Sequence, residues 1–220
     1  MEYETRFYYQ TKDLEKIINI LKEIPELHSN GRIYEKTIQY NHSDKRYDFY
    51  TKEVDGRFRL RISKNDLTNK CKLSWKQRTK DKILSSVNKE IEKEVRINAS
   101  DVDNFIYIVE NVMHFTVVES YERYRTIFEN NDIEIAVDEY PFGICLEIEN
   151  KSIDKNPEEI VKYWTKRLGL DITAAYRLSW DDKYESLCHE QNIDCYKEVT
   201  FDKPMPKVNN KFNWGWVWNY

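Results

Sequence analysis

Charged side chains recur at every second position of successive strand-like segments, and most of these segments carry a single sign of charge. The basic sets are Arg57, Arg59 and Arg61; Lys72, Lys76 and Arg78; and Arg123 and Arg125. The acidic sets are Glu2 and Glu4; Glu90, Glu92 and Glu94; Glu134 and Asp138; and Glu147 and Glu149. Period-two spacing places each set on one face of its strand, with residues such as Phe58 and Leu60 on the other face. The apolar face must be covered, so the fold needs a second layer.

Helical patterns supply that layer. Apolar periodicity predicts helices after Thr11 (residues 14–24) and Ser100 (residues 102–113), and a third helix from Pro157, capped by Asn156 and ended by Gly169. Residues 28–31 are predicted to break the first helix before the next strand. Strands are predicted at residues 2–8, 33–40, 46–51, 117–128, 133–138 and 144–149, in addition to the segments that hold the other charged sets.

Two architectures fit this pattern. An open antiparallel sheet would leave the charged faces in water, which is the usual fate of alternating charge on a single strand. Blocks of one sign on six strands favour instead an enclosed charged lining. We therefore predict an α+β fold in which a closed antiparallel barrel of about eight strands has charged residues inside and helices packed on the outside.

A lining of this kind favours phosphate chemistry. Clustered carboxylates repel one another and take up protons unless a divalent cation neutralises them, and carboxylate oxygens suit Mg²⁺ or Mn²⁺. Rows of arginine and lysine suit a chain of phosphates, since guanidinium groups bind phosphate oxygens in pairs. The residues thus predict metal-dependent hydrolysis of a triphosphate, in which a carboxylate orients the attacking water.

Composition excludes several other classes. The 220 residues suit one domain, and a net charge of −4 with a pI near 5.7 gives no general basic surface for duplex nucleic acid. No segment has the roughly 20 apolar residues of a membrane span, and no leader pattern opens the chain, so we expect a cytoplasmic protein without membrane contact, either a monomer or a homodimer. Four scattered cysteines are expected to be reduced thiols.

The ordered motifs resemble those of the CYTH, or triphosphate tunnel metalloenzyme, superfamily. Its opening ExExK strand is similar to Glu2-Tyr3-Glu4-Thr5-Arg6, in which arginine replaces the lysine. Its later elements resemble, in order, Arg59-Leu60-Arg61, the strand of Lys76, Glu90-Ile91-Glu92, Arg123-Tyr124-Arg125, Asp138 and Glu147-Ile148-Glu149. No single motif is specific, but the ordered set covers most of the chain. The resemblance implies an eight-stranded tunnel that binds a triphosphate and a divalent metal.

Site residues follow from the resemblance, position by position. The metal ligands it implies are Glu2, Glu4, Asp138, Glu147 and Glu149, and the catalytic carboxylates are Glu4, Glu92 and Glu147. The phosphate-binding residues it implies are Arg6, Arg59, Arg61, Lys76, Arg123 and Arg125. Substrates of the family include inorganic tripolyphosphate, nucleoside and thiamine triphosphates and the triphosphate at an RNA 5′ end. The alternatives are an adenylyl cyclase that converts ATP to cyclic AMP and pyrophosphate, and a triphosphate-binding module without turnover.

The resemblance divides the chain into a tunnel domain, residues 1–187, and a C-terminal extension, residues 188–220. The extension ends with aromatic residues at alternate positions: Phe212, Trp214, Trp216, Trp218 and Tyr220. Such a strip could form a platform for a base or a partner. We favour the alternative that it packs on the outer wall of the barrel, because five large aromatic side chains left in water would promote association.

Overall fold

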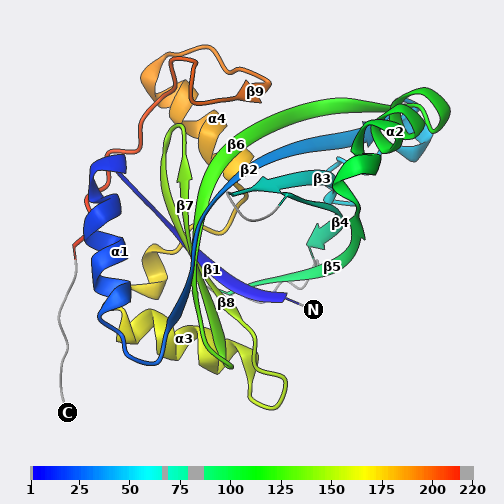
Figure 1. Cartoon of the computed structure of the whole chain (residues 1–220). Coiled ribbons are helices and arrows are strands. Elements are labelled where there is room, and N and C mark those ends of the chain that lie inside the picture. Colours follow the sequence, from blue (N-terminus) through cyan, green and yellow to red (C-terminus); the bar gives the residue numbers. More distant parts are fainter. Residues whose placement is uncertain (1, 66–68, 79–86, 214–220) are drawn as a thin grey trace.

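The computed structural model describes residues 2–65, 69–78 and 87–213, and eight of its strands form one closed antiparallel barrel (Figure 1). These strands are β1 (Glu2–Tyr9), β2 (His28–His42), β3 (Gly56–Lys64), β4 (Asn69–Arg78), β5 (Asn88–Ile97), β6 (Phe115–Glu129), β7 (Ile133–Tyr140) and β8 (Gly143–Asn150). They pair in the order β2-β3-β4-β5-β1-β8-β7-β6, and pairing of β2 with β6 closes the barrel. The predicted fold class is confirmed.

Four helices cover the outside of the barrel. They are α1 (Leu14–Lys22), α2 (Val102–Tyr107), α3 (Pro157–Arg167) and α4 (Trp180–Gln191). The apolar faces of α1 and α3 pack together on β1, β7 and β8, where Ile144, Leu146 and Ile148 are fully buried. Helix α2 covers β2, β3 and β4 (Figure 1). Helix α4 packs on another part of the wall, where its buried residues form a cluster with Tyr121, Tyr140 and Phe142. In the described part of the chain, no helix is both long and apolar enough to span a membrane.

Register determines which side chains point inward together. On β1 and β8, Glu4 lies opposite Glu149 and Arg6 lies opposite Glu147. On β3 and β2, Arg61 lies opposite Thr37 and Arg59 opposite Gln39. Because side chains alternate across a strand, the apolar neighbours of these residues point outward to the helices. The charged sets therefore face the barrel interior, as the alternating pattern predicts.

Two local predictions are wrong. Residues 46–51 do not form a strand: Lys45–Tyr47 is a 3₁₀ turn, because the Asp44 side chain accepts a hydrogen bond from the backbone N–H of Arg46 (2.9 Å) and the Asp48 side chain accepts one from Tyr50 (2.9 Å). Residues 28–31 are not the break between the first helix and the next strand, because α1 already ends at Lys22 and β2 begins at His28. The register shifts between Ser29 and Arg32, and Gly31 has a φ of 78° there.

The second helix is also less regular than its periodicity predicts. A short 3₁₀ turn, Ala99–Asp101, precedes α2, and a π-helical segment, Ile108–Val112, follows it. Wider π-helical turns rotate the following residues off the apolar face. Val109 is buried, whereas Val112 and Met113, which the apolar periodicity places on the same helix face, are 62% and 46% exposed.

Beyond residue 187 the chain continues along the barrel. Helix α4 runs to Gln191, and β9 (Glu198–Val199) pairs in parallel with β6. The Val208 N–H then donates to the Phe142 carbonyl (2.8 Å), and the Phe212 ring contacts that of Tyr9. Phe212 is buried, but residues 214–220, which hold the rest of the aromatic strip, lie outside the described residues. The division at residue 187 stays a prediction.

Candidate functional site

The barrel encloses a charged cavity of about 230 Å³. Its lining includes all of the predicted site residues except Asp138: Glu2, Glu4, Arg6, Arg59, Arg61, Lys76, Glu92, Arg123, Arg125, Glu147 and Glu149. The structure therefore brings together acidic residues of β1, β5 and β8 with basic residues of β1, β3, β4 and β6. Acidic and basic side chains thus face one enclosed space. Alternating charge on solvent-exposed strands would not bring them together in this way.

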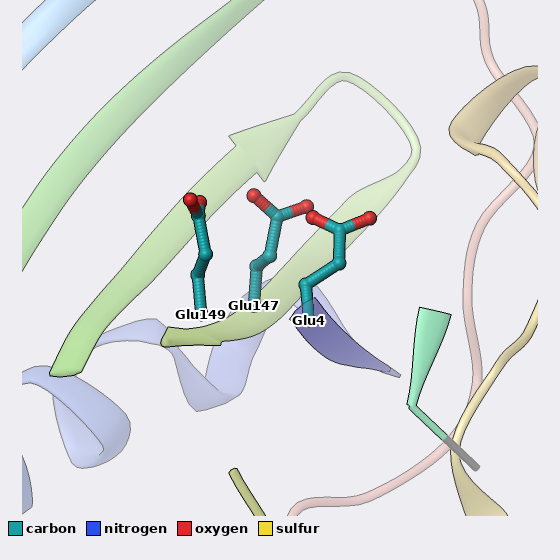
Figure 2. A group of neighbouring side chains, drawn as sticks. All are labelled: Glu4, Glu147 and Glu149. Carbon is teal, nitrogen blue, oxygen red and sulfur yellow. The ribbon is translucent and has the colours of Figure 1, made fainter. Parts of the chain in front are cut away.

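Three carboxylates form a compact group in this cavity. One oxygen each from Glu4, Glu147 and Glu149 lies within 4.8 Å of the others, and the three side chains extend from β1 and β8 toward the same space (Figure 2). The group forms because the register places Glu4 opposite Glu149, while Glu147 and Glu149 share a face of β8. Three hard oxygen donors at this spacing fit a Mg²⁺ or Mn²⁺ ion.

The electrostatics of the group support this fit. Burial and the charges of Glu2 and Glu147 raise the pKa of Glu149 to about 8. Burial also opposes ionisation of Glu147, but the guanidinium groups of Arg6 and Arg125 outweigh it and hold the pKa of Glu147 well below its usual range. The arginines thus favour the charged form of Glu147. The charged form of Glu149 needs a compensating cation to predominate at neutral pH.

Glu2 and Glu92 lie around Lys76 rather than in the three-carboxylate group. The Lys76 Nζ is 2.7 Å from Glu2 Oε2 and 3.3 Å from Glu92 Oε1. Their strands explain the arrangement, since Lys76 on β4 lies opposite Glu92 on β5, and β5 pairs with the start of β1. Both carboxylates line the same cavity as the three-carboxylate group.

Asp138 lies outside the three-carboxylate group, and its role as a metal ligand stays a prediction. It is fully buried and does not line the cavity, since its oxygens accept hydrogen bonds from Arg123 Nη1 (2.7 Å) and Arg125 Nε (2.6 Å). Glu35, which the sequence analysis did not single out, holds the other side of Arg123 through Nη2 (2.6 Å). Its alternation with Thr37 and Gln39 on β2 was the available signal. Asp138 and Glu35 therefore orient arginines that line the cavity, and Asp138 is not part of the three-carboxylate group.

The basic residues differ in how far they are already neutralised. Arg6 pairs with Glu4 and lies 3.5 Å from Glu147, and Arg123 and Arg125 pair with Asp138. Arg59 is buried, donates Nε to the Gln39 side chain (3.0 Å), and forms no ion pair with any of the described residues. A buried guanidinium without a direct ion-pair partner is free to bind an anion at close range. Arg59 therefore marks the part of the cavity that best suits an anionic ligand.

The first turn of α4 lies against one end of the cavity. Ser179 and Trp180 line it, and Ser179 Oγ accepts a hydrogen bond from Arg57 Nη2 (3.2 Å). Asp181 lies 3.9 Å from Arg57 and accepts a hydrogen bond from the Tyr50 hydroxyl (2.6 Å). These residues were absent from the predicted site, because the sequence pattern at the start of a helix does not indicate that the helix packs against the barrel cavity.

Comparison with solved structures identifies the architecture. The protein PH1819 from Pyrococcus horikoshii is 24% identical, with a TM-score of 0.65, and the match covers 84% of this chain and 99% of that chain. HpAC1 from Hippeastrum, described as a candidate adenylyl cyclase with a dominant triphosphatase activity, is 17% identical with a TM-score of 0.57, covering 90% of this chain and 99% of that one. An adenylate cyclase candidate from Vibrio parahaemolyticus is 15% identical with a TM-score of 0.58, covering 82% and 96%.

The chain has the fold of these proteins. The barrel implied by the resemblance to the CYTH superfamily is thus confirmed at the level of fold. The sequence matches no protein-family model and no curated protein. Activity must therefore be argued from the site itself.

Proposed function

We propose that this protein is a metal-dependent triphosphatase that hydrolyses a phosphoanhydride bond inside the barrel. The observation that carries the proposal is the enclosure of the three-carboxylate group together with Arg59 and Arg61 in one cavity. Glu4, Glu147 and Glu149 would hold Mg²⁺ or Mn²⁺, which would offset charge on the phosphate oxygens and on the leaving group. Glu2 would support this group from beside Lys76.

The chain's own basic residues bind and orient the phosphates in this proposal. Arg59 and Arg61 on β3, Lys76 on β4, and Arg123 and Arg125 on β6 approach from one part of the wall, while Arg6 binds phosphate and the Glu4 and Glu147 carboxylates from the other. Preorganised guanidinium groups stabilise charge as it develops on the transferred phosphoryl oxygens, and they require no reorganisation at that moment. Glu92, which lies outside the three-carboxylate group, orients the attacking water and accepts its proton.

An adenylyl cyclase is the second candidate, because a wider and more apolar cavity adjoins the charged one. It has a volume of about 500 Å³, shares Arg61, Lys72 and Glu94 with the charged cavity, and includes Ile33 and Ile97. A nucleoside could occupy it while its phosphates enter the barrel. The same cavity would accept the organic part of a nucleotide or the 5′ end of an RNA that is hydrolysed rather than cyclised.

Phosphorus NMR of the purified protein tests these candidates. Samples with Mg²⁺ or Mn²⁺ would contain tripolyphosphate, ATP, thiamine triphosphate or a 5′-triphosphate RNA. We expect metal-dependent release of orthophosphate from at least one of them. Pyrophosphate with cyclic AMP from ATP would identify a cyclase instead, and metal binding without any product would leave a triphosphate-binding module.

Replacing Arg59 with glutamine is expected to raise KM about tenfold or more, because a charge-assisted hydrogen bond to a buried phosphate contributes about 1.5–3 kcal/mol. The free energy of unfolding should change little, since Arg59 has no ion pair among the described residues. Arg57→Gln is the matched control: it leaves Asp181 buried without its cation, and we expect it to lower stability by about 3–5 kcal/mol. Equal stability losses in both variants would contradict the assignment of Arg59 to an anionic ligand.

A further inference from the structure

The hydroxyl of Tyr121 lies among the arginines of the charged cavity. Tyr121 precedes Arg123 by two residues on β6, is 1% exposed and lines the cavity. Its ring is fixed against Trp180, with 4.2 Å between ring centroids, and against Tyr140, with 5.7 Å between centroids. The phenol oxygen is therefore held in place, and it cannot turn away to solvent.

The Tyr121 hydroxyl is hydrogen-bonded within this basic cluster. Its oxygen accepts a hydrogen bond from Arg61 Nη2 (3.3 Å) and is also hydrogen-bonded to the Thr37 side chain. The Thr37 oxygen in turn accepts a hydrogen bond from Arg61 Nε (3.2 Å). Among the described residues, no carboxylate accepts a hydrogen bond from Tyr121, so its O–H can be given to an anionic ligand that enters the cavity.

The charges around Tyr121 favour ionisation in the empty cavity. The groups that face it are Arg59 and Arg61 from β3, Thr37 from β2, Arg123 from β6, Tyr140 from β7 and Trp180 from α4. The acids of this region pair with other groups: Glu35 and Asp138 pair with Arg123, Glu35 also lies 3.7 Å from Arg61, and Glu119 and Asp181 accept hydrogen bonds from Tyr50. Burial disfavours the phenolate, but the three guanidinium groups outweigh it and lower the pKa of Tyr121 to about 7. Burial raises the pKa of the neighbouring Tyr140 instead.

We propose that the Tyr121 hydroxyl is a phosphate ligand of the cavity and takes up a proton when a triphosphate binds. The inference rests on the proposed function, since it requires that a phosphate chain enter among Arg59, Arg61 and Arg123. The bound anion adds negative charge beside these guanidinium groups and repels a phenolate. Tyr121 then recovers its proton from solvent and donates it in a hydrogen bond to a phosphate oxygen.

Proton linkage predicts the direction in which the affinity for triphosphate changes with pH. Above the pKa of free Tyr121, near 7, each bound triphosphate takes up one proton, so the affinity falls about tenfold for every pH unit. Tripolyphosphate also titrates, so the relevant quantity is the ratio of wild-type affinity to that of Tyr121→Phe. The ratio should fall about tenfold between about pH 8 and 9, whereas the ratio of wild type to Tyr140→Phe should stay constant.

Ultraviolet absorbance of tyrosinate provides the direct test. Full-length wild type and Tyr140→Phe should show one tyrosinate at about pH 8, and Tyr121→Phe should show none. Rapid mixing with tripolyphosphate and Mg²⁺ should remove this band as the ligand binds, before turnover. Circular dichroism and a thermal melt establish that each variant is folded, and Tyr140→Phe controls for loss of a second buried hydroxyl that also meets Arg123 (3.2 Å).

Each outcome bears on a separate claim. No tyrosinate in wild type at this pH would overturn the inference. A band that persists while orthophosphate is released would also overturn it and leave the proposed function intact. A normal band with neither binding nor release of phosphate would refute the proposed function, and the inference would fall with it.

Discussion

Replacing Glu149 with glutamine is expected to reduce metal-dependent hydrolysis severely while leaving the protein at least as stable as the wild type. Loss of one of three carboxylate ligands should reduce kcat on the order of 10²- to 10³-fold, because the metal supplies several kcal/mol of charge stabilisation. Glutamine resembles the protonated acid in shape. Since the pKa of Glu149 is raised to about 8, that neutral form is already the favoured one in the metal-free protein at neutral pH.

The pH dependence of the free energy of unfolding distinguishes loss of the metal ligand in Glu149→Gln from a simple loss of fold. The pKa of Glu149 rises from 4.5 in the unfolded chain to about 8 in the folded one, so the folded state binds more protons between these values. Its contribution to stability is fully present below about pH 4.5 and is lost as the pH rises toward 8. Denaturant titrations in EDTA should therefore show that wild type loses a few kcal/mol more than Glu149→Gln over this range.

Glu139→Gln is the matched control for the same change of residue. Glu139 lies on β7 and pairs with the half-exposed Arg32 (2.7 Å), a surface contact that contributes about 1 kcal/mol or less. Hydrolysis and the pH profile of stability should both stay near those of wild type. If Glu149→Gln kept full metal-dependent activity, or unfolded more readily than wild type at pH 8, the three-carboxylate metal site would be wrong.

The alternating pattern predicted the barrel and its lining because strand geometry is local. Period-two spacing places Glu147 and Glu149 on one face whatever the rest of the chain does, and covering the apolar face by helices then turns that face inward. The compact group needed more: Glu4 meets Glu149 only through the register of β1 on β8, which depends on contacts far apart in sequence. The resemblance to a known family supplied that pairing, and periodicity alone could not.

The sequence analysis missed Tyr121 and Trp180 as residues of the cavity lining. Both are aromatic, and a search for alternating charge does not detect aromatic residues, although Tyr121 lies two residues before Arg123 on the same face of the strand. The predicted strand at residues 46–51 failed because Asp44 and Asp48 bind nearby backbone N–H groups, a local competition that apolar content does not reveal. Val112 and Met113 became exposed because the π-helical segment changed the helical period.

Replacing Asp138 with asparagine gives the second large expected effect. Asp138→Asn should lower the free energy of unfolding by about 3–5 kcal/mol, because Arg123 and Arg125 would remain buried without their shared carboxylate. Asp132→Asn is the matched control: Asp132 pairs with the half-exposed Lys155 (2.6 Å), and its loss should cost about 1 kcal/mol or less. Denaturant midpoints of the two variants measure the difference.

Mn²⁺ titrations of the folded proteins should show that Asp138→Asn binds the ion nearly as well as wild type, whereas Glu149→Gln does not. A variant of Asp138 that kept wild-type stability but lost the ion would restore Asp138 to the metal ligands and would remove the positioning role that the structure gives it.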